Sequence, residues 1–164
     1  MKKLNDYVNV YKEQLKKGDI QQAYDGLIKY VMRLRTNLSK NLSDSYSFGN
    51  LFQGYLDYTY FYYSNDFLKK RKLKLALVLN HTNMQFEIWL LGQTVPIQDK
   101  YWQSFKTTKW NKDRTTKPKY SILETVLNEN PNFNDLDLLS QQIEDKLVIV
   151  SSEIIDYIKK SKLT

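Results

Sequence analysis

Cysteine is absent from this sequence of 164 residues, and the chain contains only five glycines, three prolines and one histidine. Without cysteine there is no disulfide, no thiol nucleophile and no cysteine-ligated zinc or iron–sulfur centre. The glycines are scattered and form no phosphate-binding loop. The one histidine, His81, falls in a predicted turn, where a catalytic triad would be hard to complete. These absences predict no cofactor and no metal centre, and they favour a binding or regulatory module over an enzyme.

Long apolar runs are also missing. No uninterrupted apolar segment approaches the roughly 18 residues that a membrane-spanning helix requires. The first residues, MKKLNDYVNVYKEQL, begin with two lysines as a signal peptide does, but Asn, Asp, Lys and Glu interrupt the apolar positions that follow. Together with the lack of cysteine, this pattern predicts a cytoplasmic protein that does not associate with membranes.

Apolar and aromatic side chains are plentiful: 41% of the residues are hydrophobic and 14% are Phe, Trp or Tyr. This composition excludes a disordered chain. A chain of 164 residues can bury roughly two-thirds of the surface that it exposes when unfolded. We therefore expect residues 1–164 to form a single domain.

Three segments have the apolar periodicity of long helices. The first covers residues 8–15 and ends at Gly18. Asp19 is placed to cap the second, in which apolar residues recur at intervals of three and four. The third follows Asp135, after a loop rich in Asn and Pro, and continues into the C-terminal region. We expect these three helices to pack on an antiparallel sheet, because the apolar face of the hairpin at residues 72–91 needs a helical layer over it.

Four segments have the composition of strands: residues 55–63, 72–80, 84–91 and 120–127. We expect the first three to form an antiparallel meander, with Leu79 opposite Met84, so that one face of the hairpin is wholly apolar and the other mixed. Pro96 begins a short helix before the fourth strand, whereas residues 42–50 have loop composition. The predicted fold class is α+β: two N-terminal helices, a three-strand antiparallel meander, a helix, a fourth strand and a long C-terminal helix.

The segment GYLDYTYFYYS contains six aromatic rings within Tyr55–Tyr63. On a strand these rings point to both faces, and no Lys or Arg occurs between Lys40 and Lys69, whereas an RNA-stacking sheet combines one aromatic face with basic neighbours. The pattern therefore predicts a strand that is covered on both faces or borders a cavity. Buried tyrosine hydroxyls need hydrogen-bond partners, so a partly polar pocket beside this strand is an open alternative.

Asp57, Glu87 and Lys74 are the candidate catalytic residues. Neighbouring strands can bring them together on the mixed face of the predicted sheet. Two carboxylates and a lysine can perform acid–base chemistry or hold a divalent ion, and such groups are more often rim charges or one buried ion pair. An enzyme that uses these three residues is one alternative function.

A basic segment follows the predicted short helix. Residues 94–120 carry a net charge of +5, whereas residues 121–164 carry −4. The candidate nucleic-acid-binding residues in this segment combine cations with an aromatic ring: Lys109, Trp110, Lys112, Arg114 and Lys117. Cations neutralise phosphates, and an exposed Trp can stack on an unpaired base. If the protein has a macromolecular partner, the charge pattern favours an anionic one such as nucleic acid.

Four segments resemble a small family of uncharacterised bacterial proteins that is known only as a domain of unknown function. They are YKEQLKKGDIQQAYDGLIKYVMRLRT, FQGYLDYTYF, LALVLNHTNMQFEIWLLGQ and NPNFNDLDLLSQQIE. The resemblance extends over nearly the whole chain and implies a compact domain. It implies no activity and no catalytic residue.

The predicted order of elements is also similar to the core of restriction-endonuclease-like folds. In that family, an acid on the second strand and an acid–x–Lys motif on the third bind the metal. Here KLKLALVLN contains no acid, and Glu87-Ile88-Trp89 has Trp where the motif has Lys. The resemblance therefore implies a nuclease-like core without its metal motif, and a nucleic-acid-binding protein is the second alternative function.

Overall fold

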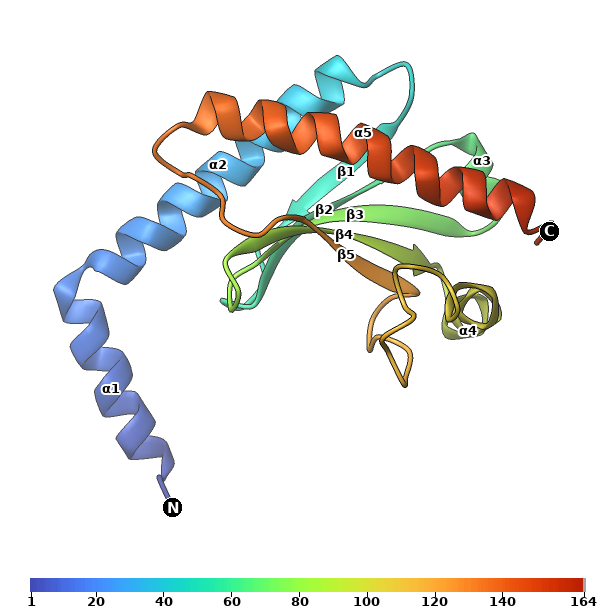
Figure 1. The fold of residues 1–164 in the computed structure, drawn as a ribbon. Helices are drawn as coiled ribbons and strands as arrows, with labels where there is room; N and C mark the ends of the chain where they lie inside the picture. Colours follow the sequence, from blue (N-terminus) through green and yellow to red (C-terminus); the bar gives the residue numbers. More distant parts are fainter. Residues whose placement is uncertain (164) are drawn as a thin grey trace.

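The computed structural model describes residues 1–163 and contains two layers, a curved antiparallel sheet and a layer of helices above it (Figure 1). The elements in chain order are α1 (Leu4–Lys17), α2 (Asp19–Asn41), β1 (Ser47–Phe52), β2 (Tyr58–Ser64), α3 (Asp66–Lys70), β3 (Leu73–Asn80), β4 (Gln85–Gly92), α4 (Val95–Phe105), β5 (Leu123–Asn128) and α5 (Leu136–Lys160). This arrangement confirms the predicted α+β class, with two N-terminal helices and a long C-terminal helix.

Gly18 separates the first two helices. Its φ of 82° lies in the left-handed region, which glycine enters without steric cost. Helix α2 buries an apolar stripe against the sheet, including Val31, Leu34 and Leu38. Helix α1 buries no residue and projects away from the sheet (Figure 1). Within residues 1–163, none of the helices combines the length and the apolar character needed to cross a membrane.

The sheet is a five-stranded antiparallel meander in the order β1-β2-β3-β4-β5. The predicted three-strand meander (β2, β3 and β4) and the further strand (β5) are present, and β1 is an additional strand in residues that we expected to form a loop. Its sequence, SFGNLF, contains no β-branched residue, and its pairing with β2 shifts between Phe48 and Leu51. Arg35 of α2 donates to the carbonyl of Gly49 at 2.8 Å, so contacts from elsewhere in the chain hold this strand.

The predicted register of the β3–β4 hairpin was wrong by two residues. Leu79 pairs with Phe86 rather than with Met84. Met84 has a left-handed φ of 48° and belongs to the turn, so the connection is longer than we expected. A shift of two residues keeps every side chain on its face, because strand side chains alternate with a period of two. The predicted apolar and mixed faces are therefore both present.

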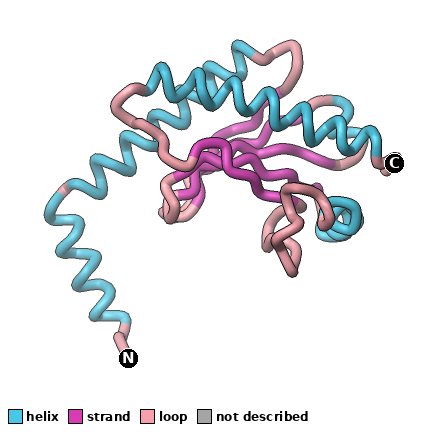
Figure 2. Tube along the Cα trace, viewed as in Figure 1, coloured by secondary structure: helices cyan, strands magenta, loops and turns pink. Residues whose placement is uncertain are grey.

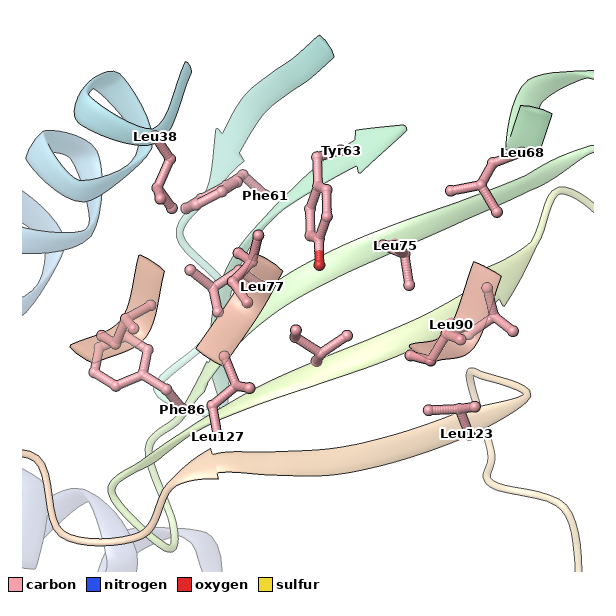
Figure 3. Close-up of a cluster of buried hydrophobic side chains, with 14 of the residues drawn as sticks. Leu38, Phe61, Tyr63, Leu68, Leu75, Leu77, Phe86, Leu90, Leu123 and Leu127 are labelled. Atoms are coloured by element: carbon pink, nitrogen blue, oxygen red, sulfur yellow. The ribbon is translucent and has the colours of Figure 1, made fainter. Parts of the chain in front are cut away.

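We call the side of the sheet beneath α2 and α5 the covered face. Its aliphatic and aromatic side chains interlock with those of the two helices (Figure 3). They include Phe61, Leu75, Leu77, Phe86, Ile88 and Leu90, each at most 1% exposed. Tyr63 is also buried here, and its hydroxyl lies 2.8 Å from Ser151 Oγ of α5, so its polar atom is satisfied inside the core.

We call the opposite side of the sheet the open face, and none of the long helices in residues 1–163 crosses it. Helix α4 lies beside it at the end of β4, and the long loop between α4 and β5 lies on the same side (Figure 2). The core side chains of α4, Tyr101 and Phe105, are buried in the main core, so this helix is firmly attached to the domain. The open face therefore remains accessible between α4, this loop and the turn before β2.

Candidate functional site

The open face carries a cleft of about 820 Å³, which we call the aromatic cleft. Its floor consists of alternate residues of the three central strands: Tyr58, Tyr60, Tyr62, Lys74, Ala76, Val78, Trp89 and Leu91. Phe52 and the turn before β2 form one wall, and Gln98 of α4 and Tyr120 of the long loop contribute on the other sides. The cleft is thus built by alternation in the strands and closed by three segments that are distant in sequence.

Aromatic rings on the cleft floor contact one another in two groups. The Phe52 and Tyr60 rings are stacked, with centroids 5.0 Å apart and planes inclined by 18°. The Tyr58 ring meets the Trp89 ring edge-on at 5.0 Å. Such contacts hold the rings in place, yet Tyr58, Tyr60 and Tyr62 are only half-buried. The predicted strand that borders a cavity is present, and it begins at Tyr58 rather than at Tyr55.

Lys74 is the cation of the cleft. Its Nζ lies 3.5 Å from the centroid of the Tyr62 ring. Burial lowers the pKa of Lys74, because an ammonium group loses hydration there. Burial also raises the pKa of Tyr62 to about 12. Among residues 1–163, no carboxylate forms an ion pair with Lys74.

Glu87 is 4% exposed, and its carboxylate is engaged by three neighbours. Trp89 Nε1 donates to Oε1 at 3.0 Å, and Asn80 Nδ2 and Gln85 Nε2 donate to Oε2 at 2.9 and 3.1 Å. These bonds fix the Trp89 indole on the cleft floor. The carboxylate therefore acts here as a support for the ring, with its acceptor sites largely used.

Asp57 lies in the turn before β2, at the edge of the cleft. Its Oδ1 accepts the backbone N–H groups of Tyr55 and Tyr58 at 2.8 and 2.7 Å. These two bonds stabilise the charged form and lower the pKa of the Asp57 carboxyl. The side chain is exposed, and its bonding is that of a turn-forming aspartate.

The structure does not bring the three candidate catalytic residues together. Glu87 pairs with Val78, which lies four residues along β3 from Lys74, a separation of about 13 Å along the strand. Asp57 precedes Tyr58, at the end of β2 that pairs with Asn80, also remote from Lys74. None of the three forms an ion pair with another in the described chain. Nor do any three Asp, Glu or His side chains in residues 1–163 lie close enough to hold a metal ion.

Gln98 of α4 is the polar residue that sequence reasoning missed. It is 8% exposed, and its Oε1 has no hydrogen-bond partner within residues 1–163. The helix approaches β4 so closely at Gly92 that an added Cβ would lie 2.8 Å from Gln98 N and 2.9 Å from its Cγ. Only the absence of a side chain at Gly92 permits this approach. The only local sequence signal near Gln98 is Gly-Gln-Thr at residues 92–94. This tripeptide indicates that a helix begins after it, and it does not indicate a binding site.

The basic segment lies in the long loop, and most of its candidate residues already have protein partners. Lys109 pairs with Glu153 at 2.7 Å, Arg114 with Glu124 at 3.3 Å and Lys117 with Asp99 at 3.5 Å. Lys112 is exposed.

The Trp110 ring is half-buried and packs against the rings of Phe105 and Tyr157. Stacking on a base would require this ring to present a free face. Nucleic-acid binding by this segment stays a prediction, and its cations would first have to leave their carboxylate partners.

A family model matches residues 4–158, and the chain belongs to that family, which is described as a Domain of unknown function (DUF7000). The match confirms the predicted resemblance to a family of unknown function over nearly the whole chain. Neither the search of curated proteins nor the search of solved structures finds a match. The similarity to restriction-endonuclease-like folds therefore stays a prediction.

Proposed function

We propose that the protein is a cytoplasmic binding module that holds a small organic molecule, with a flat apolar body, in the aromatic cleft. The observation that carries this proposal is the cleft of about 820 Å³ floored by aromatic side chains. Its volume lies within the roughly 300–1,000 Å³ range of small-molecule sites. Aromatic faces attract flat ligands by stacking and by burial of apolar surface.

The chemistry of the open face supports a ligand rather than simple contact with water. An antiparallel sheet can leave one face to solvent, but that face is then normally polar. Here Ala76, Val78, Trp89 and Leu91 form a buried apolar cluster, and the tyrosine rings of the neighbouring strand β2 pack against it. A polar face would keep the protein soluble. An apolar floor with half-buried rings instead favours binding, because a ligand removes apolar surface from water.

The positions and hydrogen-bond partners of the charged side chains favour binding over catalysis. The Glu87 carboxylate supports Trp89, the Asp57 carboxylate supports a turn, and both are remote from Lys74. A general acid or base must reach the same substrate atom as its partner groups. The lack of cysteine supports a reducing, cytoplasmic location for the module.

Titration with 1-anilinonaphthalene-8-sulfonate tests the proposal. We expect its fluorescence to rise on binding and the Trp89 indole N–H resonance to shift in nuclear magnetic resonance spectra. Tyr60→Ala should weaken binding about threefold to tenfold, because one stacking contact contributes about 0.5–1.5 kcal/mol.

Tyr11→Ala is the matched control, because this exposed tyrosine lies on α1, away from the cleft. It should leave the affinity unchanged. A probe that binds without shifting the Trp89 resonance, or that is weakened by Tyr11→Ala as much as by Tyr60→Ala, would contradict the proposal.

A further inference from the structure

We infer that the ligand of the aromatic cleft is a planar organic acid: its acidic group binds Lys74, and an N–H or O–H group on its body donates to Gln98 Oε1. This inference rests on the proposed function and specifies the ligand class.

Lys74 and Gln98 lie at the same end of the cleft. Lys74 pairs across the β3–β4 hairpin with Leu91. The next residue, Gly92, is the point where α4 approaches the sheet, with Gln98 Cγ 2.9 Å from the position of an added Cβ. Both Lys74 and Gln98 line the cleft. The end of the cleft near Gly92 is therefore polar, and the floor beyond it is aromatic and aliphatic.

Lys74 has no anionic partner within residues 1–163. Its ammonium lies on the face of the Tyr62 ring, which attracts the cation but carries no charge. A charge that is withdrawn from water is stabilised by pairing, and the lowered pKa of Lys74 reflects this cost of burial. The two glutamates on the same face have other partners. Glu124, opposite Trp89, pairs with Arg114 and accepts a hydrogen bond from Ser121. Glu87 is about 13 Å away along the strand and accepts three other hydrogen bonds. A carboxylate or sulfonate on the ligand would provide the missing partner.

Gln98 lacks a hydrogen-bond donor. Its Oε1 is shielded from water, and no donor in residues 1–163 reaches it. Buried acceptors are nearly always satisfied, because an unsatisfied one costs about 1–3 kcal/mol. Gln98 lines the cleft, and the terminal torsion of glutamine is soft, so the orientation of this oxygen can adjust to a bound ligand. A donor on the ligand would then satisfy it.

Beyond this polar end, the floor consists of Tyr60, Val78 and Trp89. A flat ring system fits these surfaces, whereas a flexible chain would gain less from the ring faces. Asp57 at the far end is negatively charged, which disfavours an acid placed in the reverse orientation. The ligand therefore has its acid near Lys74 and its ring system over Trp89.

Three matched probes separate these contributions. Indole-3-acetate has the ring, the acid and an N–H donor; naphthalene-1-acetate lacks the donor; indole-3-ethanol lacks the acid. Binding is measured for each from the shift of the Trp89 indole N–H resonance. In the wild-type protein, indole-3-acetate should bind about tenfold more tightly than indole-3-ethanol, because hydrogen bonds to charged groups are the stronger class. It should bind about threefold more tightly than naphthalene-1-acetate.

Three variants assign the preferences to residues. Lys74→Met should remove the preference for indole-3-acetate over indole-3-ethanol, and Lys74→Arg should retain it. Gln98→Met, which keeps the length of the side chain, should remove only the preference over naphthalene-1-acetate. Amide resonances outside the cleft report whether each variant is folded, and the comparison of the three probes on the wild-type protein remains decisive if a variant is not.

The outcomes distinguish this inference from the function on which it rests. If none of the three probes and no anilinonaphthalene sulfonate shifts the Trp89 resonance, the proposed function fails. If all three bind with equal affinity, the cleft binds flat molecules and the inferred ligand class is wrong. If the wild-type preferences exist but survive Lys74→Met and Gln98→Met, the assignment to these two residues is wrong.

Discussion

The two faces of the same sheet differ in what covers them and in what they contain. The covered face is filled by side chains such as Leu75, Leu77 and Ile88, which α2 and α5 bury almost completely. The open face presents tyrosine and tryptophan rings, Lys74 and two glutamates, Glu87 and Glu124, and it retains a cleft of about 820 Å³. Consecutive residues of one strand thus belong to two surfaces with different purposes: packing on one side and, as we propose, recognition on the other.

The contrast shows why the open face is not a second core. Aliphatic side chains interlock and leave little space, which is how the covered face gains stability. Rings that stand on a sheet without a helix above them leave gaps, and they keep polar atoms at their edges.

Truncation on the covered face should cost most. Leu77→Ala should lower the free energy of unfolding by about 3 kcal/mol, because it leaves a cavity beneath α2 and α5. Tyr60→Ala, on the open face of the adjacent strand, should cost about 1 kcal/mol or less, because its ring is only half-buried. Urea unfolding measures both. Equal losses would mean that the two faces contribute alike to stability and would contradict the contrast.

Removal of the Glu87 carboxylate should have the next largest effect. Glu87→Ala leaves the Trp89, Asn80 and Gln85 donors without their acceptor, and we expect a loss of about 2 kcal/mol in urea unfolding. Glu87→Gln keeps one acceptor oxygen and should cost less. The Trp89 indole N–H resonance should move in both variants. An unchanged resonance would show that this bond does not hold the ring.

The free energy of unfolding should depend on pH through His81, whose Nε2 lies 2.7 Å from Oγ1 of the buried Thr59. Burial lowers the pKa of His81 below its ordinary value of 6.5, although the charge of Asp57 partly opposes the shift. The unfolded chain therefore binds a proton at higher pH than the folded chain does. The stabilisation is present above about pH 6.5 and is lost as the pH falls below it.

His81→Gln isolates this effect. The difference in the free energy of unfolding between wild type and variant should change with pH below about 6.5 and be constant above it. Other titrating groups contribute equally to both proteins, so their contributions cancel in this difference. One such group is Glu124, because burial raises the pKa of its carboxyl. A difference that does not vary with pH would show that His81 titrates alike in both states.

The basic segment beside the open face should have the smallest effect. Replacement of Lys109, Lys112, Arg114 and Lys117 by Gln should change the free energy of unfolding only slightly, because each exposed ion pair contributes at most about 1 kcal/mol. We also expect that this replacement does not weaken any binding of nucleic acid, because three of the four cations already pair with carboxylates of the protein.

Titration with single-stranded DNA at about 50 mM salt tests that expectation. Binding whose logarithm falls with the logarithm of salt by about 0.7 per phosphate contact, and whose slope flattens in the four-residue variant, would instead establish the predicted nucleic-acid interface. If the Trp110 ring stacks on a base, Trp110→Ala would then weaken binding to the DNA. If the ring only packs against Phe105, the variant would leave the affinity for DNA unchanged.

Patterns that depend on neighbouring residues could be predicted from the sequence. The alternation in residues 72–91 placed Leu75 and Leu77 on one face and Lys74 and Glu87 on the other, and it survived an error of two residues in the register. The helix stop at Gly18 and the α5 start after Asp135, whose side chain accepts from Leu138 N at 3.1 Å, follow from local backbone chemistry.

The cleft and its polar end were decided by the tertiary structure. β1 exists because β2 and Arg35 supply its hydrogen bonds, and its own sequence does not favour a strand. Lys74 and Gln98 share one end of the cleft because α4 meets β4 at Gly92, a contact between residues that no periodicity connects. Local sequence determined which face each side chain occupies, whereas packing between distant segments determined which of those side chains meet, because a strand sets its own alternation but not its neighbours.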